Sequence, residues 1–275
     1  MASFSPSDAA LEGFQVLGRR WRLVVGWAGF NLIAMVALVV VTTIVAASAV
    51  LVAGGDSAAV GASVAAPVVS LATIVMQFVI GVAVYRAIFR PDERGFLYLR
   101  IGPDEARCLA AALIGALAAG VLVLAAVVLA RAVRPVAAIG PTLIGAASLV
   151  VGYWLMMRFG LVGPICVAER RLDFAKSWRL TRGKAWSLTG MSLLAGCLAA
   201  LITVVVWAGF FLLSLAVLGF HDLGSLVGPE GLSAHPGLFL LQAIAPFLTA
   251  PVVLVLALAP WAAAYRALGS PSAEG

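Results

Sequence analysis

The sequence predicts an all-α fold, a polytopic bundle of six transmembrane helices with amphipathic helices at the cytoplasmic interface. Three observations lead to this prediction. Of the 275 residues, 63% are hydrophobic and only 11% are charged, whereas a soluble domain carries roughly 25% charged residues. The apolar residues fall into six long runs, and the basic residues gather in alternate connections between the runs. We therefore expect a single integral membrane domain over residues 1–275.

Each of the six runs is long enough for one membrane-spanning helix, which needs about 20 mostly apolar residues. The strands of a membrane β-barrel would be shorter and would alternate apolar with polar residues, a pattern that these runs lack. The predicted spans cover residues 24–53, 66–89, 108–130, 141–168, 187–219 and 238–264.

The basic residues predict the orientation of these spans. No Lys or Arg occurs in 54–65 or in 220–237, and only Arg131 and Arg134 lie between the third and fourth spans. The other 16 of the 18 basic residues lie in the remaining connections or near the chain ends. Because short cytoplasmic loops are enriched in Lys and Arg, both termini are predicted to be cytoplasmic. The preference for Arg over Lys, with much Ala and Gly, indicates a bacterial source and hence the inner membrane.

A polar stretch that is typical of a helix start introduces each pair of spans. Ser5-Pro6 offers a capping serine, residues 102–105 place a proline and two acids in a first turn, and Asp173 can cap the next helix. Aromatic and basic residues then follow at helical spacing, which fits the cytoplasmic headgroup layer. The simpler alternative is that such helices only anchor the bundle and set its topology. The predicted interfacial helix carries Phe174, Lys176, Trp178, Arg179, Arg182, Lys184 and Trp186.

The two ends of the chain also resemble one another. Residues 8–23 match 173–188 at several positions, and Tyr85-Arg86-Ala87 has the same sequence as residues 265–267. We interpret these matches as repeats of an amphipathic helix followed by a helical hairpin. The possible repeats cover residues 5–90, 102–168 and 173–268.

Arg158 is an arginine within an otherwise uncharged apolar run, and a charged residue inside the membrane is by default a functional-site hypothesis. Either it marks the cytoplasmic interface and residues 159–168 re-enter or lie flat, or one long tilted helix holds it within the bundle. Together with Arg86 and Arg266 it gives one arginine per repeat. We expect these three to surround a cytoplasm-facing mouth that binds an anionic headgroup or phosphate. The simpler alternative is that they are anchors that snorkel to the interface.

The sequence offers little for catalysis. No GxSxG, HExxH or P-loop pattern occurs, and Cys108, Cys166 and Cys197 are too widely spaced for a CxxC pair. We therefore predict that the protein is not an enzyme and has no catalytic, cofactor or metal site. Because the basic residues lie between apolar runs, we expect anionic membrane lipids as partners and no nucleic acid.

Residues 174–186 carry the pattern Ser-Trp-x-Leu-Thr-Arg-Gly-x-x-Trp. This pattern resembles a signature of proteins related to the membrane domain of glycerophosphoryl diester phosphodiesterase, a grouping that includes small six-span inner-membrane proteins. The resemblance implies an α-helical inner-membrane module. In that family the hydrolase is a separate soluble domain, which we do not find in this sequence, so we do not expect phosphodiesterase activity here.

These observations favour a non-enzymatic inner-membrane protein, a lipid-interacting or accessory module. A small transporter or permease for an anionic or lipid-like substrate is the alternative, with the three arginines receiving the anion. A third possibility is an interaction subunit whose lipid-facing surface binds another membrane protein. The scarcity of polar residues in the spans argues against a transport path.

Overall fold

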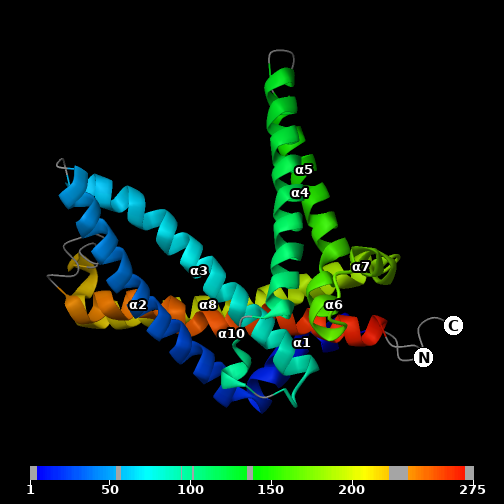
Figure 1. Cartoon of the computed structure of the whole chain (residues 1–275), viewed down its shortest axis with the longest axis horizontal. Helices are drawn as coiled ribbons and strands as arrows, with labels where there is room; N and C mark the ends of the chain where they lie inside the picture. The colour runs from blue at the N-terminus through cyan, green and yellow to red at the C-terminus, as the bar shows by residue number, and fades with distance from the viewer. Residues whose placement is uncertain are drawn as a thin grey trace. The chain divides into compact units, whose positions relative to one another are not determined.

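The computed structural model describes residues 5–53, 57–93, 95–100, 102–134, 139–222 and 235–269, and these residues form helices and no strand. Figure 1 labels the elements along the chain. They are α1 (Pro6–Arg19), α2 (Trp21–Ala53), α3 (Ser57–Phe89), the short 3-10 helix η1 (Phe96–Tyr98), α4 (Pro103–Val133), α5 (Gly140–Phe159), α6 (Val162–Ala168), α7 (Phe174–Thr181), α8 (Ala185–Asp222) and α10 (Pro236–Leu268).

Six helical segments are long and apolar enough to cross a membrane, and each contains or closely matches one of the runs seen in the sequence. The all-α, six-span prediction is therefore confirmed. The segments are Trp21–Ser48, Ala65–Phe89, Phe96–Val133, Gly140–Ala168, Ala185–Gly219 and Pro236–Leu268.

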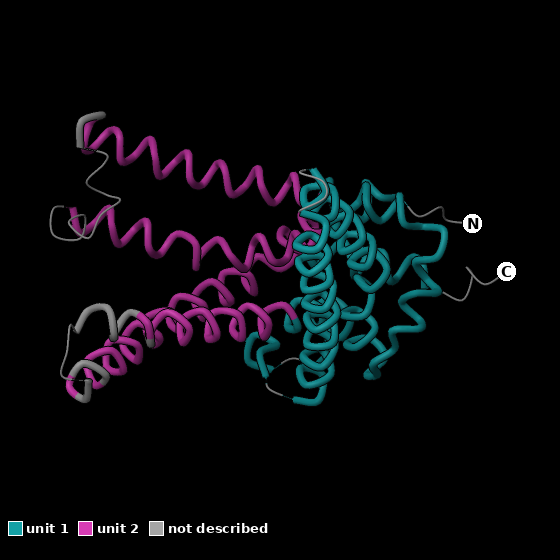
Figure 2. The backbone as a smooth tube through the Cα atoms, turned by 90° about the horizontal axis from the view of Figure 1, so that it is seen from above, with its two compact units in different colours: residues 1–12, 82–194, 258–275 teal, residues 13–81, 195–257 magenta. Residues whose placement is uncertain are grey.

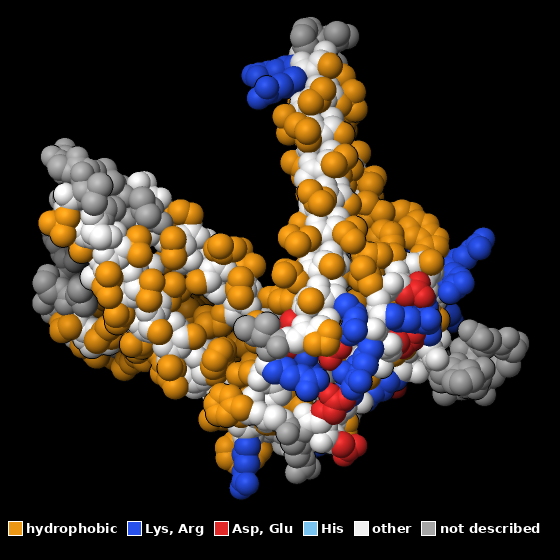
Figure 3. All heavy atoms as spheres, viewed as in Figure 1, with side chains coloured by type: hydrophobic (Ala, Val, Ile, Leu, Met, Phe, Trp, Pro, Cys, Tyr) orange, Lys and Arg blue, Asp and Glu red, His pale blue; other side chains and the backbone are white. Residues whose placement is uncertain are grey.

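The apolar side chains of these segments mostly face outward. In α4, for example, Leu117, Val121 and Leu124 each expose more than half of their surface. Figure 3 shows apolar side chains covering the visible side of the α4–α5 hairpin, with charged side chains gathered near the start of α4. Large exposed apolar surfaces of this kind are rare on soluble monomers, so lipid is the solvent that suits them.

The helix starts follow the expected local chemistry. Pro103 opens α4 with Asp104 and Glu105 in its first turn. Asp173 caps α7, because its side chain accepts a hydrogen bond from the backbone N–H of Lys176 at 2.7 Å. Gly219 ends the regular part of α8 with φ of 72°, a conformation that glycine adopts without steric cost.

The chain divides into two compact units, coloured separately in Figure 2. Unit 2 comprises residues 13–81 and 195–257 and contains α2 with the larger parts of α3, α8 and α10. Its apolar helices are joined by a buried amide, Asn31, which donates to the carbonyl of Phe247 at 2.6 Å and accepts from Gln77 at 3.5 Å. Interhelical hydrogen bonds from uncharged side chains are a common way to fix packing between membrane helices.

Unit 1 comprises residues 1–12, 82–194 and 258–275, and it holds nearly all of the charged residues discussed below. Its core is built around α6, where Val162, Ile165, Cys166 and Val167 are buried. The unit also contains the α4–α5 hairpin, α7, the last turns of α3 and α10, the first half of α1 and the start of α8.

The fourth apolar run is broken within unit 1. Helix α5 ends at Phe159 and the short α6 begins at Val162, although the two together make up one candidate span, Gly140–Ala168. The depth of Arg158 in a membrane stays a prediction. The break lies at Gly160, where an added Cβ would come within 2.3 Å of the Trp261 ring. Arg158 therefore lies in the last turn of α5, directly before the chain turns into the core.

Candidate functional site

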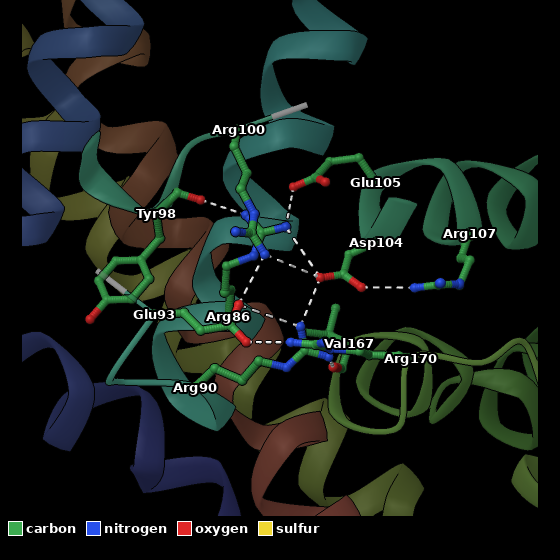
Figure 4. A network of polar contacts seen from close by, with 10 residues as sticks. All are labelled: Arg86, Arg90, Glu93, Tyr98, Arg100, Asp104, Glu105, Arg107, Val167 and Arg170. Carbon is green, nitrogen blue, oxygen red and sulfur yellow. Dashed lines mark hydrogen bonds and ion pairs between the residues drawn. The ribbon is translucent and has the colours of Figure 1, made fainter. Parts of the chain in front are cut away.

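The charged residues of unit 1 form a pocket of about 660 Å³ at the connection between α3 and α4. Among the described residues, seven charged side chains line it, namely Arg86, Arg100, Arg107, Arg170, Asp92, Glu93 and Asp104, as the view in Figure 4 shows for most of them.

Arg86 lies at the bottom of this network and exposes only 1% of its surface. Its guanidinium forms an ion pair with Glu105, approaches Asp104 at 3.7 Å and donates to the carbonyl of Tyr98 at 2.6 Å. A buried charge is tolerated only when it is paired and hydrogen-bonded, and this arrangement supplies both. The Arg86 charge is thus matched within the protein.

Arg90, directly after the end of α3, extends the network to other elements. It pairs with Asp104 at 2.8 Å and donates to the carbonyl of Val167 in α6. Asp104 also pairs with Arg107 at 2.9 Å and lies 3.8 Å from Arg100. One carboxylate therefore ties the end of α3 to the start of α4.

Glu93, which also lines the pocket, is the centre of a second group of ion pairs. Its carboxylate pairs with Arg100 at 2.9 Å and with Arg170, and lies 3.7 Å from Arg90. Burial pushes the pKa of Glu93 upward, but the neighbouring arginines outweigh this effect and hold that pKa below its ordinary value. Glu93 is therefore ionised at neutral pH and neutralises part of the positive charge of the pocket.

A third group of charges surrounds Glu169, just after α6. This carboxylate accepts hydrogen bonds from Lys176 and from the hydroxyl of Tyr265, and it pairs with Arg171 at 2.7 Å. Burial raises the pKa of Glu169, yet these three partners together lower it below the ordinary value. The group joins α7 to the last turn of α10.

Sequence reasoning missed the role of Asp104 and Glu105. It interpreted them only as acids that suit the N-terminus of α4, which they are, but both are also buried partners of Arg86. The sequence did contain a signal for this pairing. Arg86 and Arg90 lie at the end of one predicted span, and Asp104 and Glu105 lie at the start of the next. Because the connection between these spans is short, both ends must lie on the same side of a membrane.

The three arginines expected to share a mouth have no partner in common among the described contacts. Arg86 belongs to the buried network above. Arg266 donates to the carbonyl of Ile88 at 2.7 Å, stacks on the Phe89 ring at 5.5 Å and lies 3.6 Å from Glu12. Two of the three arginines therefore have acceptors and counter-charges of their own.

Arg158 differs from the other two. Its guanidinium carbon lies 5.2 Å from the ring centroid of Trp154 and 5.0 Å from that of Trp178. It forms no ion pair with any described residue, and its Nε and Nη1 are buried without a hydrogen-bond partner. Its backbone carbonyl accepts hydrogen bonds from the hydroxyls of Ser177 and Thr181.

The predicted interfacial segment is a helix, α7, followed by a turn at Gly183 with φ of 75° and the start of α8. Its two faces differ. Ser177 and Thr181 are fully buried, whereas Trp178 is 37% and Trp186 88% exposed. The outer face and the turn also carry exposed cations that form no ion pair with a described residue, namely Arg179, Arg182 and Lys184.

No group of three or more His, Cys, Asp or Glu residues suited to a metal ion occurs among the described residues. Most of the connection 220–237 lies outside the described side chains. No family model, curated protein or solved structure matches the chain. The resemblance of residues 174–186 to the phosphodiesterase membrane-domain family therefore stays a prediction.

Proposed function

We propose that the protein is a non-enzymatic integral protein of the bacterial inner membrane that binds anionic lipid headgroups at the cytoplasmic face, as a lipid-interacting or accessory module. One observation carries this proposal. The segment 174–186 presents unpaired cations beside two exposed indole rings, at the end of helices that are apolar enough to cross a membrane. Tryptophan and basic residues are the side chains that favour the membrane–water interface.

The charge balance of unit 1 supports this surface rather than the pocket as the lipid contact. In the pocket network, each described arginine has Glu93, Asp104 or Glu105 within ion-pair distance. On α7 and the following turn, Arg179, Arg182 and Lys184 have no such partner in the part of the chain that the structure describes. Each basic residue near an anionic surface contributes about 1 kcal/mol to the attraction, so these cations together favour anionic over zwitterionic lipid.

The test compares two variants that each lose two exposed charges. In Arg182→Gln/Lys184→Gln the lost charges belong to the proposed surface. In Arg131→Gln/Arg134→Gln they lie at the opposite end of α4. Native mass spectrometry of the detergent-purified proteins, titrated with phosphatidylglycerol and phosphatidylcholine, measures the apparent affinity for each lipid.

The wild type and the Arg131/Arg134 variant should prefer phosphatidylglycerol. The Arg182/Lys184 variant should lose roughly tenfold or more of that preference, since two charges contribute about 2 kcal/mol. Equal lipid affinities in all three proteins would contradict the proposed function. Such a result would favour the alternative that α7 only anchors the bundle and sets its topology.

A further inference from the structure

Arg158 is a partly buried cation for which the described residues supply no counter-charge. Its Nε and Nη1 are withdrawn from solvent without an acceptor. Placing a guanidinium in this state is costly unless an anion or an acceptor satisfies it. Nε of Arg86 is also buried without an acceptor, but Arg86 has Glu105 and Arg266 has Glu12 as a counter-charge within unit 1, so Arg158 is distinguished by the lack of a carboxylate among the described residues.

The surroundings of Arg158 hold its guanidinium in a fixed position. Trp154 precedes it by one turn on α5, and Trp178 comes from α7, with the two indole rings edge to face at 5.3 Å. Both rings lie within cation–π distance of the guanidinium. The hydroxyl of Ser177, at 2.8 Å from the Arg158 carbonyl, fixes the backbone of the same residue. A donor held in this way loses little entropy when it binds an acceptor.

One part of the guanidinium is accessible. Nη2 is not among the buried atoms, and the Arg158 side chain as a whole keeps part of its surface exposed. The indole rings beside it are also partly open, with Trp154 41% and Trp178 37% exposed. The guanidinium thus lies within cation–π distance of two indole rings that are themselves partly exposed.

We propose that Arg158 binds a single phosphate group through Nη2, with Trp154 and Trp178 positioning the guanidinium. Arginine forms charge-assisted hydrogen bonds to phosphate oxygens, which are about twice as strong as bonds between neutral groups. Indole rings suit the boundary between headgroup and acyl chain. The inference deepens the lipid binding proposed above and rests on it where the phosphate belongs to a lipid, although a free phosphate ester offers the same chemistry.

Arg266 provides a matched control for this site. It is also an arginine in the last turn of a long helix, and it also stacks on an aromatic ring, that of Phe89. It differs in that the Ile88 carbonyl and Glu12 satisfy its guanidinium. Removing its charge should therefore change the anchoring of α10 without affecting phosphate binding.

The experiment measures binding of the first lipid molecule by native mass spectrometry for the wild type and for Arg158→Gln, Arg158→Lys and Arg266→Gln. The probes are phosphatidylglycerol, phosphatidylcholine and, in a separate titration, glycerol 3-phosphate and inorganic phosphate. Arg158→Gln should weaken the first phosphatidylglycerol site about tenfold or more. Arg158→Lys should weaken it less, because lysine keeps the charge but loses the planar donor, and Arg266→Gln should leave it unchanged.

The two sources of phosphate give different results. If glycerol 3-phosphate or inorganic phosphate binds the wild type and competes with the lipid, and Arg158→Gln abolishes this, Arg158 recognises free phosphate as well. If only phosphatidylglycerol shows the Arg158 dependence, the site is specific for lipid. Should Arg158→Gln fail to fold, Trp178→Phe, which keeps an aromatic face with a weaker cation–π contact, should lower the affinity several-fold.

The outcomes also separate this site from the proposed function. A preference for phosphatidylglycerol that survives in Arg158→Gln and disappears in Arg182→Gln/Lys184→Gln overturns the Arg158 site alone. A wild type without any preference for phosphatidylglycerol, and without phosphate binding, overturns both. An equal loss of phosphatidylglycerol affinity in Arg158→Gln and Arg266→Gln also overturns the site, because it indicates a general effect of removing a positive charge.

Discussion

Arg86 and Glu105 show how a charged residue can belong to the framework of a membrane protein. Both are buried, and their ion pair joins the last turn of α3 to the first turn of α4. Removing one member of a buried pair leaves the other charge unpaired in a medium of low dielectric constant. Replacing either residue alone should therefore lower the stability strongly, whereas replacing both together should lower it much less.

We expect Arg86→Met to lower the free energy of unfolding by about 3–5 kcal/mol, because it leaves Glu105 buried without its partner. Arg86→Met/Glu105→Leu should recover much of this loss, since both charges are then absent. Thermal or SDS-induced unfolding of the purified protein measures these differences. Arg170→Gln, which removes a pair with a 60% exposed arginine, serves as a control and should cost about 0–1 kcal/mol. Equal costs for Arg86→Met and Arg170→Gln would contradict the buried network.

At the scale of the elements, the break between α5 and α6 decides where Arg158 lies. Gly160 has φ of −61° and ψ of −23°, values that any residue adopts, so its backbone does not require glycine. The requirement comes from space, because the Trp261 ring of α10 occupies the position of a Cβ. The contact seats the end of α5 directly against α10 within unit 1.

Gly160→Ala should therefore destabilise the protein by about 1–3 kcal/mol through overpacking. Gly145→Ala is the control, since Gly145 lies inside α5, the helix that ends just before Gly160, with nothing within 4 Å of an added Cβ. That change should be neutral or stabilising, because alanine favours helix more than glycine does. Unfolding in detergent compares the two variants. A stable Gly160→Ala protein would show that the ring moves aside without cost.

At the scale of the whole molecule, six apolar helices alternate with connections of very different charge. Arg131 and Arg134 are the basic residues at the far end of the α4–α5 hairpin, whereas the connections around 90–107 and 169–184 are rich in Arg and Lys. Loops with many basic residues stay on the cytoplasmic side during insertion. The distribution thus predicts one orientation for the entire chain.

Reporter fusions check this orientation in bacterial cells. Green fluorescent protein joined after residue 269 should fluoresce, since it folds in the cytoplasm. Alkaline phosphatase inserted between Arg134 and Ile139 should be active, because it needs the oxidising side of the membrane. Replacing both arginines of that hairpin by Gln leaves the bias intact and should not change either result. An active phosphatase at the C-terminus would contradict the predicted topology.

The sequence predicted the helical framework well because the bilayer imposes simple rules on it. A span needs about 20 apolar residues, and a helix start favours proline or an acid, as Pro103 and Asp173 confirm. The charged site was less predictable, because its contacts join elements far apart in the chain. Neither the Arg86–Glu105 pair nor the contact of Gly160 with Trp261 has a local pattern. Only the folded structure shows which of the described arginines have a carboxylate partner and which do not.

The position of Asp104 also has an evolutionary consequence. Its carboxylate lies within ion-pair distance of Arg86, Arg90, Arg100 and Arg107. A lineage that lost this acid would leave Arg107 without a carboxylate among the described residues and would weaken the balance of charge around the three other arginines at once. Selection should therefore hold position 104 acidic in descendants of this protein, as it should hold the buried Arg86, while the more exposed positions 100 and 107 exchange more readily.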